Sequence, residues 1–225
     1  MMDILYKDQS IIVCVKRSGE LSQAGKPGEN SLLTQLEEQL GAPIYPVHRL
    51  DRETGGLMVY ARTREAAARL SDAIARHELE KEYICVVKGI PKQKNATHSA
   101  FLTKNAKDAY VTVTPKAKNN SSKPITTQVG LVESYGDYSL LKVGLITGRT
   151  HQIRAHLAYL EMPILGDSRY GINNLNRQLK MKYQALCSRK IKFGPISDAR
   201  YSYLSGKELI CPDPWFVESF YKREF

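Results

Sequence analysis

The sequence has no long hydrophobic run. No apolar stretch approaches the roughly 18 residues that a transmembrane helix requires. The first residues, M-M-D-I-L-Y-K-D, also lack the basic flank and the apolar core of a secretory signal peptide. We therefore expect neither membrane insertion nor secretion, and a protein of the cytoplasm.

Paired cysteines and clustered histidines are missing as well. The four cysteines are far apart and form no C-x-x-C motif. Cys14 and Cys85 lie in strand-like apolar runs, where a buried free thiol is the expected state. His151 and His156 are five residues apart, which places them on different faces of a helix, unlike the i, i+4 pair of a zinc helix. The sequence thus predicts no disulfide, no metal site and a reducing compartment.

Acidic residues are too few to balance the basic ones. The chain has 33 Lys and Arg against 23 Asp and Glu, a formal charge of +10. A field of this sign favours anionic partners, of which RNA, DNA and acidic membranes are the usual ones. Charge alone leaves open a basic protein without any polyanionic partner.

Short apolar runs bounded by turn residues predict many strands and few helices. Strands are expected at 11–15, 56–61, 81–89, 109–113, 126–132 and 139–145, and around Ile191 and Leu209. Helices are expected at 32–40 after a Ser31 cap, after a Thr63 cap, at 151–161 and at 174–183.

A strand–helix–strand repeat is absent, and consecutive strands are often joined by short turns. This pattern predicts an α+β fold with a mixed, largely antiparallel central sheet and flanking helices, rather than a doubly wound parallel sheet. We see no internal repeat and no clear linker, so a single domain over residues 1–225 is the expectation.

A run of polar residues, H-R-L-D-R-E-T-G-G, interrupts apolar sequence at positions 48–56. Asp51 stands between Arg49 and Arg52, whose positive charges favour an ionised carboxylate. The two glycines that follow permit a tight turn and the close approach of another molecule. A turn-capping Asp beside solvent-facing arginines would have the same sequence, so this segment alone does not establish chemistry.

Two further segments combine polar and apolar residues. Tyr83 follows Lys81 and Glu82 at the head of an apolar strand, where its ring could stack on a nucleobase or be an ordinary half-buried tyrosine. The segment G-R-T-H-Q-I-R-A-H-L at 148–157 opens a helix. Its free N–H groups, with Arg149 and Arg154, suit an anion or a carboxylate, although a basic helix start on the surface has the same pattern.

Together these segments resemble the ribosomal large-subunit (RluA-type) pseudouridine synthases. The run H-R-L-D-R-E-T-G-G-L is similar to that family's H-R-L-D-x-x-T-S-G-L signature, and residues 148–157 are similar to its second signature. P-I-L-G-D at 163–167, Y-G at 170–171 and K-E-Y at 81–83 follow in the family's order, and residues 8–19 resemble its N-terminal element. The resemblance covers about residues 3–215.

The sequence departs from the family pattern in places. Gly55 stands where the family usually has Ser, and Arg17 and Ser18 replace a Pro and a small residue. We expect no S4 RNA-binding domain of the kind that many relatives carry before the catalytic segment. We therefore expect the catalytic domain itself to hold RNA, in keeping with the net charge.

The resemblance implies roles for individual residues. Asp51 would be the essential carboxylate, Arg154 its ion-pair partner, Tyr83 the ring stacked on the target uracil, and Arg49 the filler of the space that the nucleotide leaves. Further RNA contacts are predicted for His48, Arg52, Arg149, Thr150, His151 and Gln152. His48, Thr150, His151 and Gln152 could instead brace the site, and we favour internal hydrogen bonding for the two histidines. Asp167 is expected to cap a turn rather than take part in chemistry.

The resemblance implies an RNA pseudouridine synthase, an isomerase acting on rRNA or tRNA. No cofactor is expected, because bond energy is redistributed within one nucleotide, and a monomer is the default. One alternative is a hydrolase that releases uracil, which would need a second carboxylate such as Glu53. Another is a non-catalytic RNA-binding or ribosome-assembly factor with the same fold.

Overall fold

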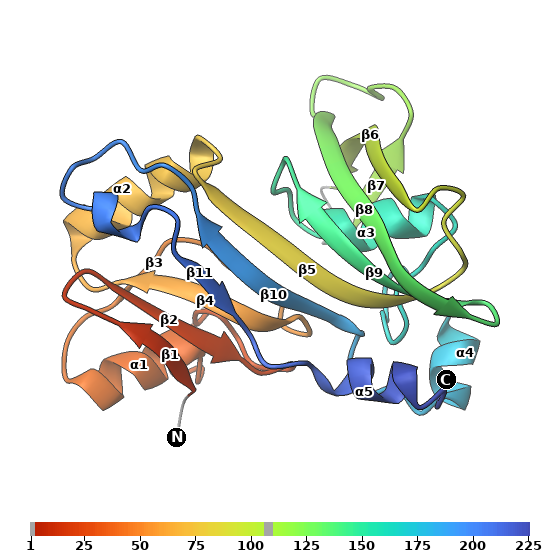
Figure 1. Cartoon of the computed structure of the whole chain (residues 1–225), viewed down its shortest axis with the longest axis horizontal. Coiled ribbons are helices and arrows are strands. Elements are labelled where there is room, and N and C mark those ends of the chain that lie inside the picture. Colours follow the sequence, from red (N-terminus) through yellow and green to blue (C-terminus); the bar gives the residue numbers. More distant parts are fainter. Residues whose placement is uncertain (1–2, 106–109) are drawn as a thin grey trace. The chain divides into compact units, whose positions relative to one another are not determined.

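The computed structural model of this protein describes residues 3–105 and 110–225. The chain folds into two compact units, each built from two separate stretches of sequence (Figure 1). The first unit comprises Met1–Lys81 and Cys187–Pro214, and the second comprises Glu82–Leu186 and Trp215–Phe225. The single domain expected over residues 1–225 stays a prediction.

The sheet of the first unit is built on a central buried strand. Its strands are β1 (Ile4–Lys7), β2 (Ile11–Lys16), β3 (Tyr45–Pro46), β4 (Gly55–Ala61), β10 (Leu186–Phe193) and β11 (Glu208–Ile210). The order is β1-β2-β4-β10, with β3 on β4 and β11 on β10. Only the β4–β10 pair is parallel among these strands. All seven residues of β4 are buried, because β2 and β10 flank it in the sheet and α2 packs against it.

The helices of the first unit begin where the sequence predicts. α1 (Leu32–Leu40) is capped by Ser31, whose hydroxyl accepts from Thr34 N while the Thr34 hydroxyl accepts from Ser31 N. α2 (Arg64–Ala75) is capped by Thr63, whose hydroxyl accepts from Ala66 N. Each cap satisfies an N–H that has no partner inside the helix. A 3₁₀ turn, η1, spans Ser202–Leu204.

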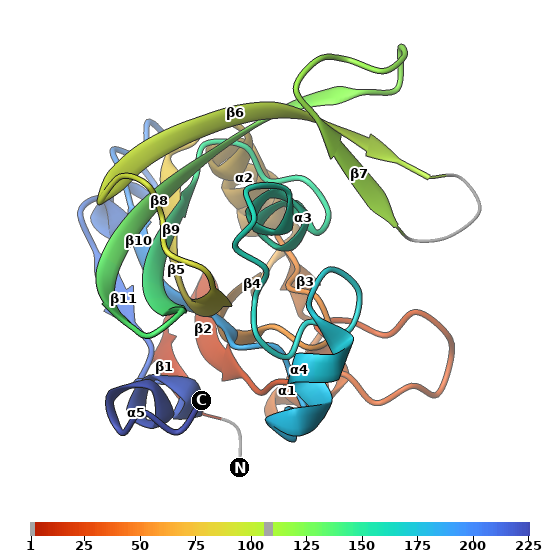
Figure 2. The same ribbon diagram turned by 90° about the vertical axis from the view of Figure 1, so that its right-hand side faces the viewer.

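The second unit is an antiparallel sheet packed on a helix. Its strands are β5 (Leu79–Lys88), β6 (Asn95–Lys104), β7 (Val111–Thr114), β8 (Lys123–Tyr135) and β9 (Tyr138–Leu145). They follow the order β5-β9-β8-β6-β7, and each strand is antiparallel to its neighbours in this order. Helix α3 (Gln152–Tyr159) lies against β7 and β8, beside the long curved strands β6 and β8 (Figure 2). α4 (Asn173–Gln178) and α5 (Trp215–Tyr221) complete the unit.

The predicted fold class is confirmed: the protein is α+β, with a mostly antiparallel sheet and few helices. The helix expected at 174–183 is wrong at its end, because α4 stops at Gln178. β1, β3 and α5 were missed, since runs of two to seven residues carry too little periodicity to be recognised. Of the strand expected at 109–113, Ala109 lies outside the described residues. No helix of the described part is both long and apolar enough to span a bilayer.

Candidate functional site

Asp51 lies in the loop between β3 and β4, and the backbone is held on both sides of it. The carbonyl oxygen of Asp51 accepts a hydrogen bond from Thr54 N at 3.0 Å, which closes a turn just before β4. On the N-terminal side, the buried Ser22 hydroxyl donates to Leu50 O at 2.9 Å and accepts from Leu50 N at 3.1 Å. The half-buried Asp51 side chain therefore projects from a loop with little conformational freedom.

On the C-terminal side of Asp51, a buried lysine fixes the next residue. Lys16, only 1% exposed, donates from Nζ to the carbonyl oxygens of Arg17, Glu20 and Arg52 at 3.1, 2.7 and 2.9 Å. Gly19 N also donates to Arg52 O, and Arg52 Nε donates back to Gly19 O at 3.1 Å. Burial lowers the pKa of Lys16 to about 8, while the charges of Glu20 and Asp51 act in the opposite direction. Sequence reasoning did not single out Lys16, although it belongs to the N-terminal element of the resemblance.

Gly55 and Gly56, which follow the Asp51 loop, are needed for two different structural reasons. Gly56 has φ +110°, and a Cβ on it would lie 2.3 Å from Ser188 O and 2.5 Å from Ser188 N. A Cβ on Gly55 would lie 3.1 Å from Ser18 Oγ. The departures at positions 18 and 55 therefore meet in space: the Ser18 hydroxyl would be in close contact with a side chain at position 55.

The basic residues around Asp51 differ in their surroundings. His48 accepts a hydrogen bond from Val59 N at its Nε2 atom, at 3.0 Å. Burial, together with the charge of Lys81, lowers the pKa of His48 well below 6.5, so the ring is neutral and braced against β4. Arg49 and Arg52 are exposed, and Arg52 bonds Gly19 as described above. The RNA contacts predicted for these three residues stay predictions.

Tyr83 lies near the start of β5 and is 7% exposed. It pairs with Val143 of β9, so the strand sets its position. Lys81 lies two residues earlier on the same strand, hence on the same face, and burial lowers its pKa to about 8. The predicted stacking role of the Tyr83 ring stays a prediction.

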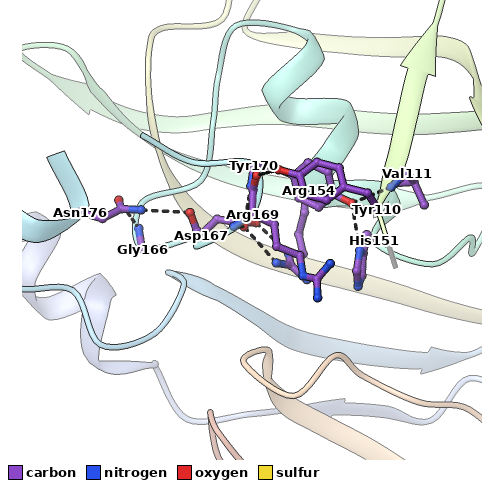
Figure 3. A network of polar contacts seen from close by, with 9 residues as sticks. All are labelled: Tyr110, Val111, His151, Arg154, Gly166, Asp167, Arg169, Tyr170 and Asn176. Carbon is purple, nitrogen blue, oxygen red and sulfur yellow. Dashed lines mark hydrogen bonds and ion pairs between the residues drawn. The ribbon is translucent and has the colours of Figure 1, made fainter. Parts of the chain in front are cut away.

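Arg154 of α3 is clamped by Asp167 (Figure 3). Arg154 Nε donates to Asp167 Oδ2 at 2.7 Å, and Nη2 donates to Oδ1 at 3.0 Å. Arg154 is 5% exposed and Asp167 is fully buried. Burial alone would raise the pKa of Asp167, but the Arg154 guanidinium and the N–H groups of Tyr170 and Arg169 hold it below its ordinary value of 3.8. The pair therefore stays ionised at neutral pH, with each charge compensating the other.

His151 precedes α3 in a left-handed conformation, with φ 54° and ψ 17°. Such a backbone costs a non-glycine residue about 1–2 kcal/mol. Its Nδ1 atom lies 3.0 Å from the Tyr170 hydroxyl, which also accepts a hydrogen bond from Val111 N at 3.0 Å. The Tyr170 ring is tilted against the Tyr110 ring, with the centroids 5.0 Å apart, and its centroid lies 5.4 Å from the Arg154 guanidinium (Figure 3). Tyr110 and Tyr170 thus connect the start of β7 to the first turn of α3.

Gln152 braces the loop before α3. Its Oε1 accepts from Arg149 N and from the Thr147 hydroxyl, and its Nε2 donates to Thr126 O and the Thr127 hydroxyl. Gln152 is 2% exposed, whereas Arg149 and Thr150 are exposed. The structure gives Gln152 an internal bonding role, and the RNA contacts predicted for these three residues stay predictions.

The described residues include no group of three or more His, Cys, Asp or Glu side chains that could hold a metal ion. All four cysteines are free and buried, as predicted for Cys14 and Cys85.

Asp51 belongs to the first unit, and Tyr83 and Arg154 to the second. The predicted pairing of Asp51 with Arg154 therefore stays a proposal. Each unit holds a charged side chain in a rigid setting, Asp51 in the first and Arg154 in the second, and can present it to a ligand.

The chain is similar to proteins of known class. A family model described as RNA pseudouridylate synthase matches residues 10–159. The tRNA pseudouridine synthase C of Haemophilus ducreyi is 32% identical over 194 residues, which cover 80% of this chain and 79% of that protein. The ribosomal large subunit pseudouridine synthase D of Yersinia pestis is 35% identical over 176 residues, 76% of this chain but 53% of that protein.

Solved structures agree on the fold. The human RNA pseudouridylate synthase domain containing 1 protein superposes with a TM-score of 0.78 at 22% sequence identity, covering 96% of this chain and 84% of that one. The human domain containing 4 protein superposes with a TM-score of 0.77 at 21% identity, covering 98% and 92% of the two chains.

Proposed function

This chain belongs to the family of RNA pseudouridylate synthases, and from that premise we propose that it isomerises uridine in tRNA or rRNA with Asp51 as the catalytic carboxylate. The enzyme is an isomerase. The observation that carries the proposal is the family match over residues 10–159, which contains Asp51, Tyr83 and Arg154 within their signature segments.

The chemistry explains why these residue types are needed. The C1′–N1 bond of the uridine breaks, the uracil rotates, a C1′–C5 bond forms, and C5 loses a proton while N1 gains one, so the composition is unchanged. Neither C1′ nor C5 is accessible in stacked RNA, so the nucleotide must leave the stack at a cost of a few kcal/mol. Stacking on Tyr83 and insertion of Arg49 into the vacated space offset that cost. We propose that Arg154 pairs with the Asp51 carboxylate and holds it close to the ribose.

Support for a rigidly presented Asp51 comes from its loop. Ser22 bonds Leu50 on one side and Lys16 bonds Arg52 on the other, so the carboxylate between them is preorganised. Preorganised charge is the form in which enzymes stabilise reacting groups most effectively. A non-catalytic RNA-binding factor has no need of a carboxylate held in this way in a basic protein, and we place that alternative second.

We propose RNA as the partner, with no cofactor or metal, for a monomer in the cytoplasm. Relatives named as tRNA pseudouridine synthase C match this chain over about four fifths of both lengths, whereas those named for the large ribosomal subunit are matched over about half of theirs. A tRNA is therefore the first substrate to test and rRNA the second. The pseudouridine map of total RNA from a deletion strain identifies the site.

The deciding experiment compares Asp51→Asn with the wild type on unmodified tRNA and rRNA. We expect Asp51→Asn to form pseudouridine at least about 100-fold more slowly, because it removes the reacting carboxylate. Asp137→Asn is the control, since Asp137 is an exposed hairpin residue paired with Lys88. Equal pseudouridine formation by Asp51→Asn and the wild type would refute the proposal, and free uracil in place of pseudouridine would identify the hydrolase.

A further inference from the structure

The side chain of Asp167, which the sequence predicts only to cap the turn after Gly166, also binds the side chain of Arg154. Asp167 accepts four hydrogen bonds: two from Arg154, one from Arg169 N at 2.8 Å and one from Tyr170 N at 3.0 Å. The two backbone bonds hold the turn, and the two side-chain bonds hold the arginine (Figure 3). Asn176 secures the turn from α4, accepting from Gly166 N at 2.8 Å and donating to Asp167 O at 3.0 Å.

The bidentate bond determines how Arg154 is oriented. A guanidinium held through Nε and Nη2 cannot rotate about its final bonds without breaking both contacts. The edge formed by Nη1 and Nη2 then points away from the Nε side, with a geometry suited to a second carboxylate or a phosphate. Asp167 therefore decides the direction in which Arg154 presents its remaining donors.

The same turn orients His151. Val111 N can only donate to the Tyr170 hydroxyl oxygen, because a backbone N–H has no acceptor capacity. The hydroxyl hydrogen then has His151 Nδ1 as its acceptor at 3.0 Å. This arrangement satisfies both groups when the His151 proton is on Nε2, so the ring presents an N–H donor from a left-handed residue at the start of α3.

We propose that the Asp167–Tyr170 turn is the positioning element of the second unit. Asp167 orients Arg154, and Tyr170 orients His151, for contact with the substrate uridine and with the Asp51 carboxylate proposed to react with it. The inference deepens the proposed function and rests on it. Neither Asp167 nor Tyr170 lies in the matched family range of residues 10–159, and both are positioning residues rather than catalytic ones.

The first test is Asp167→Asn, measured by single-turnover rate and by RNA affinity. The Asn oxygen in the place of Oδ1 can still accept from the backbone of the turn, but the amide nitrogen in the place of Oδ2 opposes the Nε donor of Arg154 and breaks the bidentate bond. We expect the rate constant to fall about 10- to 100-fold, as for a displaced reacting group, with RNA affinity within about threefold of the wild type. Asp8→Asn is the matched control, since the Asp8 carboxylate also caps a turn through Ser10 N and Ile11 N, but its side-chain partners are the hydroxyls of Tyr6 and Tyr203 rather than a guanidinium.

A second test asks whether Asp167 acts through Arg154. In an Arg154→Lys background, we expect Asp167→Asn to lower the rate less than about threefold further, because the bidentate partner is already gone. Asn176→Ala is the companion variant, since Asn176 holds the turn without bonding Arg154. An unchanged rate in Asp167→Asn, or full additivity with Arg154→Lys, overturns the inference.

Tyr170→Phe tests whether Tyr170 orients His151, and it keeps the proposal falsifiable if Asp167→Asn does not fold. The variant retains the ring and removes only the hydroxyl. We expect the ¹⁵N resonances of the His151 ring to lose the single Nε2–H tautomer, with a several-fold slower rate. An unchanged His151 tautomer overturns this part of the proposal. If Asp51→Asn is active, the proposed function fails; if Asp51→Asn is inactive while Asp167→Asn and Tyr170→Phe match the wild type, only the present inference fails.

Discussion

The two units hold their predicted site residues in opposite ways. In the first, a lysine ammonium binds three backbone carbonyl oxygens beside Asp51, so one full charge is balanced by dipoles. In the second, a carboxylate binds the Arg154 side chain, so two full charges balance each other. Both Lys16 and Asp167 are almost completely buried.

The difference between these two supports shows which part of the chain each buried charge immobilises. Lys16 fixes backbone, and thereby the loop from which Asp51 projects, whereas Asp167 fixes a side chain, and thereby the direction of a guanidinium. The pKa values follow: that of Lys16 is lowered because burial outweighs the charges of Glu20 and Asp51, and that of Asp167 is lowered because the arginine and the turn outweigh burial.

The largest expected loss of stability comes from substituting the glycine nearest to each of these two supports. Gly56 and Gly166 have φ of +110° and +75°, and a Cβ would lie 2.3 Å from Ser188 O and 2.2 Å from Tyr183 O. We expect Gly56→Ala and Gly166→Ala each to lower the free energy of unfolding by about 4 kcal/mol or more, as measured in urea. Gly136→Ala separates backbone strain from close approach, since Gly136 has φ +51° with no atom within 4 Å. It should lose about 1–2 kcal/mol; equal losses at all three positions would show that close approach is unimportant.

Lys16→Met removes the charge–dipole anchor of the first unit. At pH 7 we expect the free energy of unfolding to fall by about 3 kcal/mol, because three carbonyl oxygens lose their donor. The pKa of Lys16 is about 8 in the folded protein and 10.5 when unfolded, so between these values the unfolded chain binds more protons. The advantage of the wild type over Lys16→Met should therefore grow by about 3 kcal/mol as the pH rises through this window.

Urea titrations at pH 7 and pH 10 measure this change, and Lys88→Met is the control because Lys88 is a partly exposed lysine paired with Asp137. A gap between the wild type and Lys16→Met that narrows with rising pH would contradict the prediction. The second unit should behave differently: the stability contributed by Asp167 is present above its unfolded pKa of 3.8 and is lost only as the pH falls through the lower folded value.

The smallest expected effects are on RNA binding by two surface arginines, one in each unit. Arg49 of the first unit and Arg149 of the second are both exposed and both predicted to contact RNA. Arg49→Ala and Arg149→Ala should each weaken RNA binding and reduce the slope of log affinity against log salt by about one. Arg200→Ala is the control, because Arg200 is exposed but paired with Asp198 and Glu65. A slope unchanged in one variant would assign phosphate contact to the other unit alone.

Local signals in the sequence were sufficient for much of the fold. Ser31 and Thr63 cap the helices that their neighbours predict, and the apolar run after Asp51 is the fully buried β4. The face of α2 is less clear from its sequence: Ala66, Leu70 and Ala73 are buried, whereas Ala67 and Ile74 are half-buried. The face of an alanine-rich helix is poorly defined by sequence because alanine is tolerated on either side.

The predicted site residues were found from their motifs, but their supports were not. Asp167 was expected only to cap a turn, and it does, yet its bond to Arg154 spans 13 positions and two elements. Lys16 reaches Arg52 across 36 positions. Neither contact leaves a periodic signal, because each depends on where the chain returns rather than on its neighbours.

By itself the sequence determined most of the elements, the caps of α1 and α2, the fold class and the segments that resemble the family's signatures, since these depend on residues within a few positions of one another. Only the tertiary structure decided that a lysine holds the Asp51 loop, that Asp167 directs Arg154, and that Ser18 lies against Gly55. Buried charges must find partners wherever the fold brings them, and those partners are selected in space.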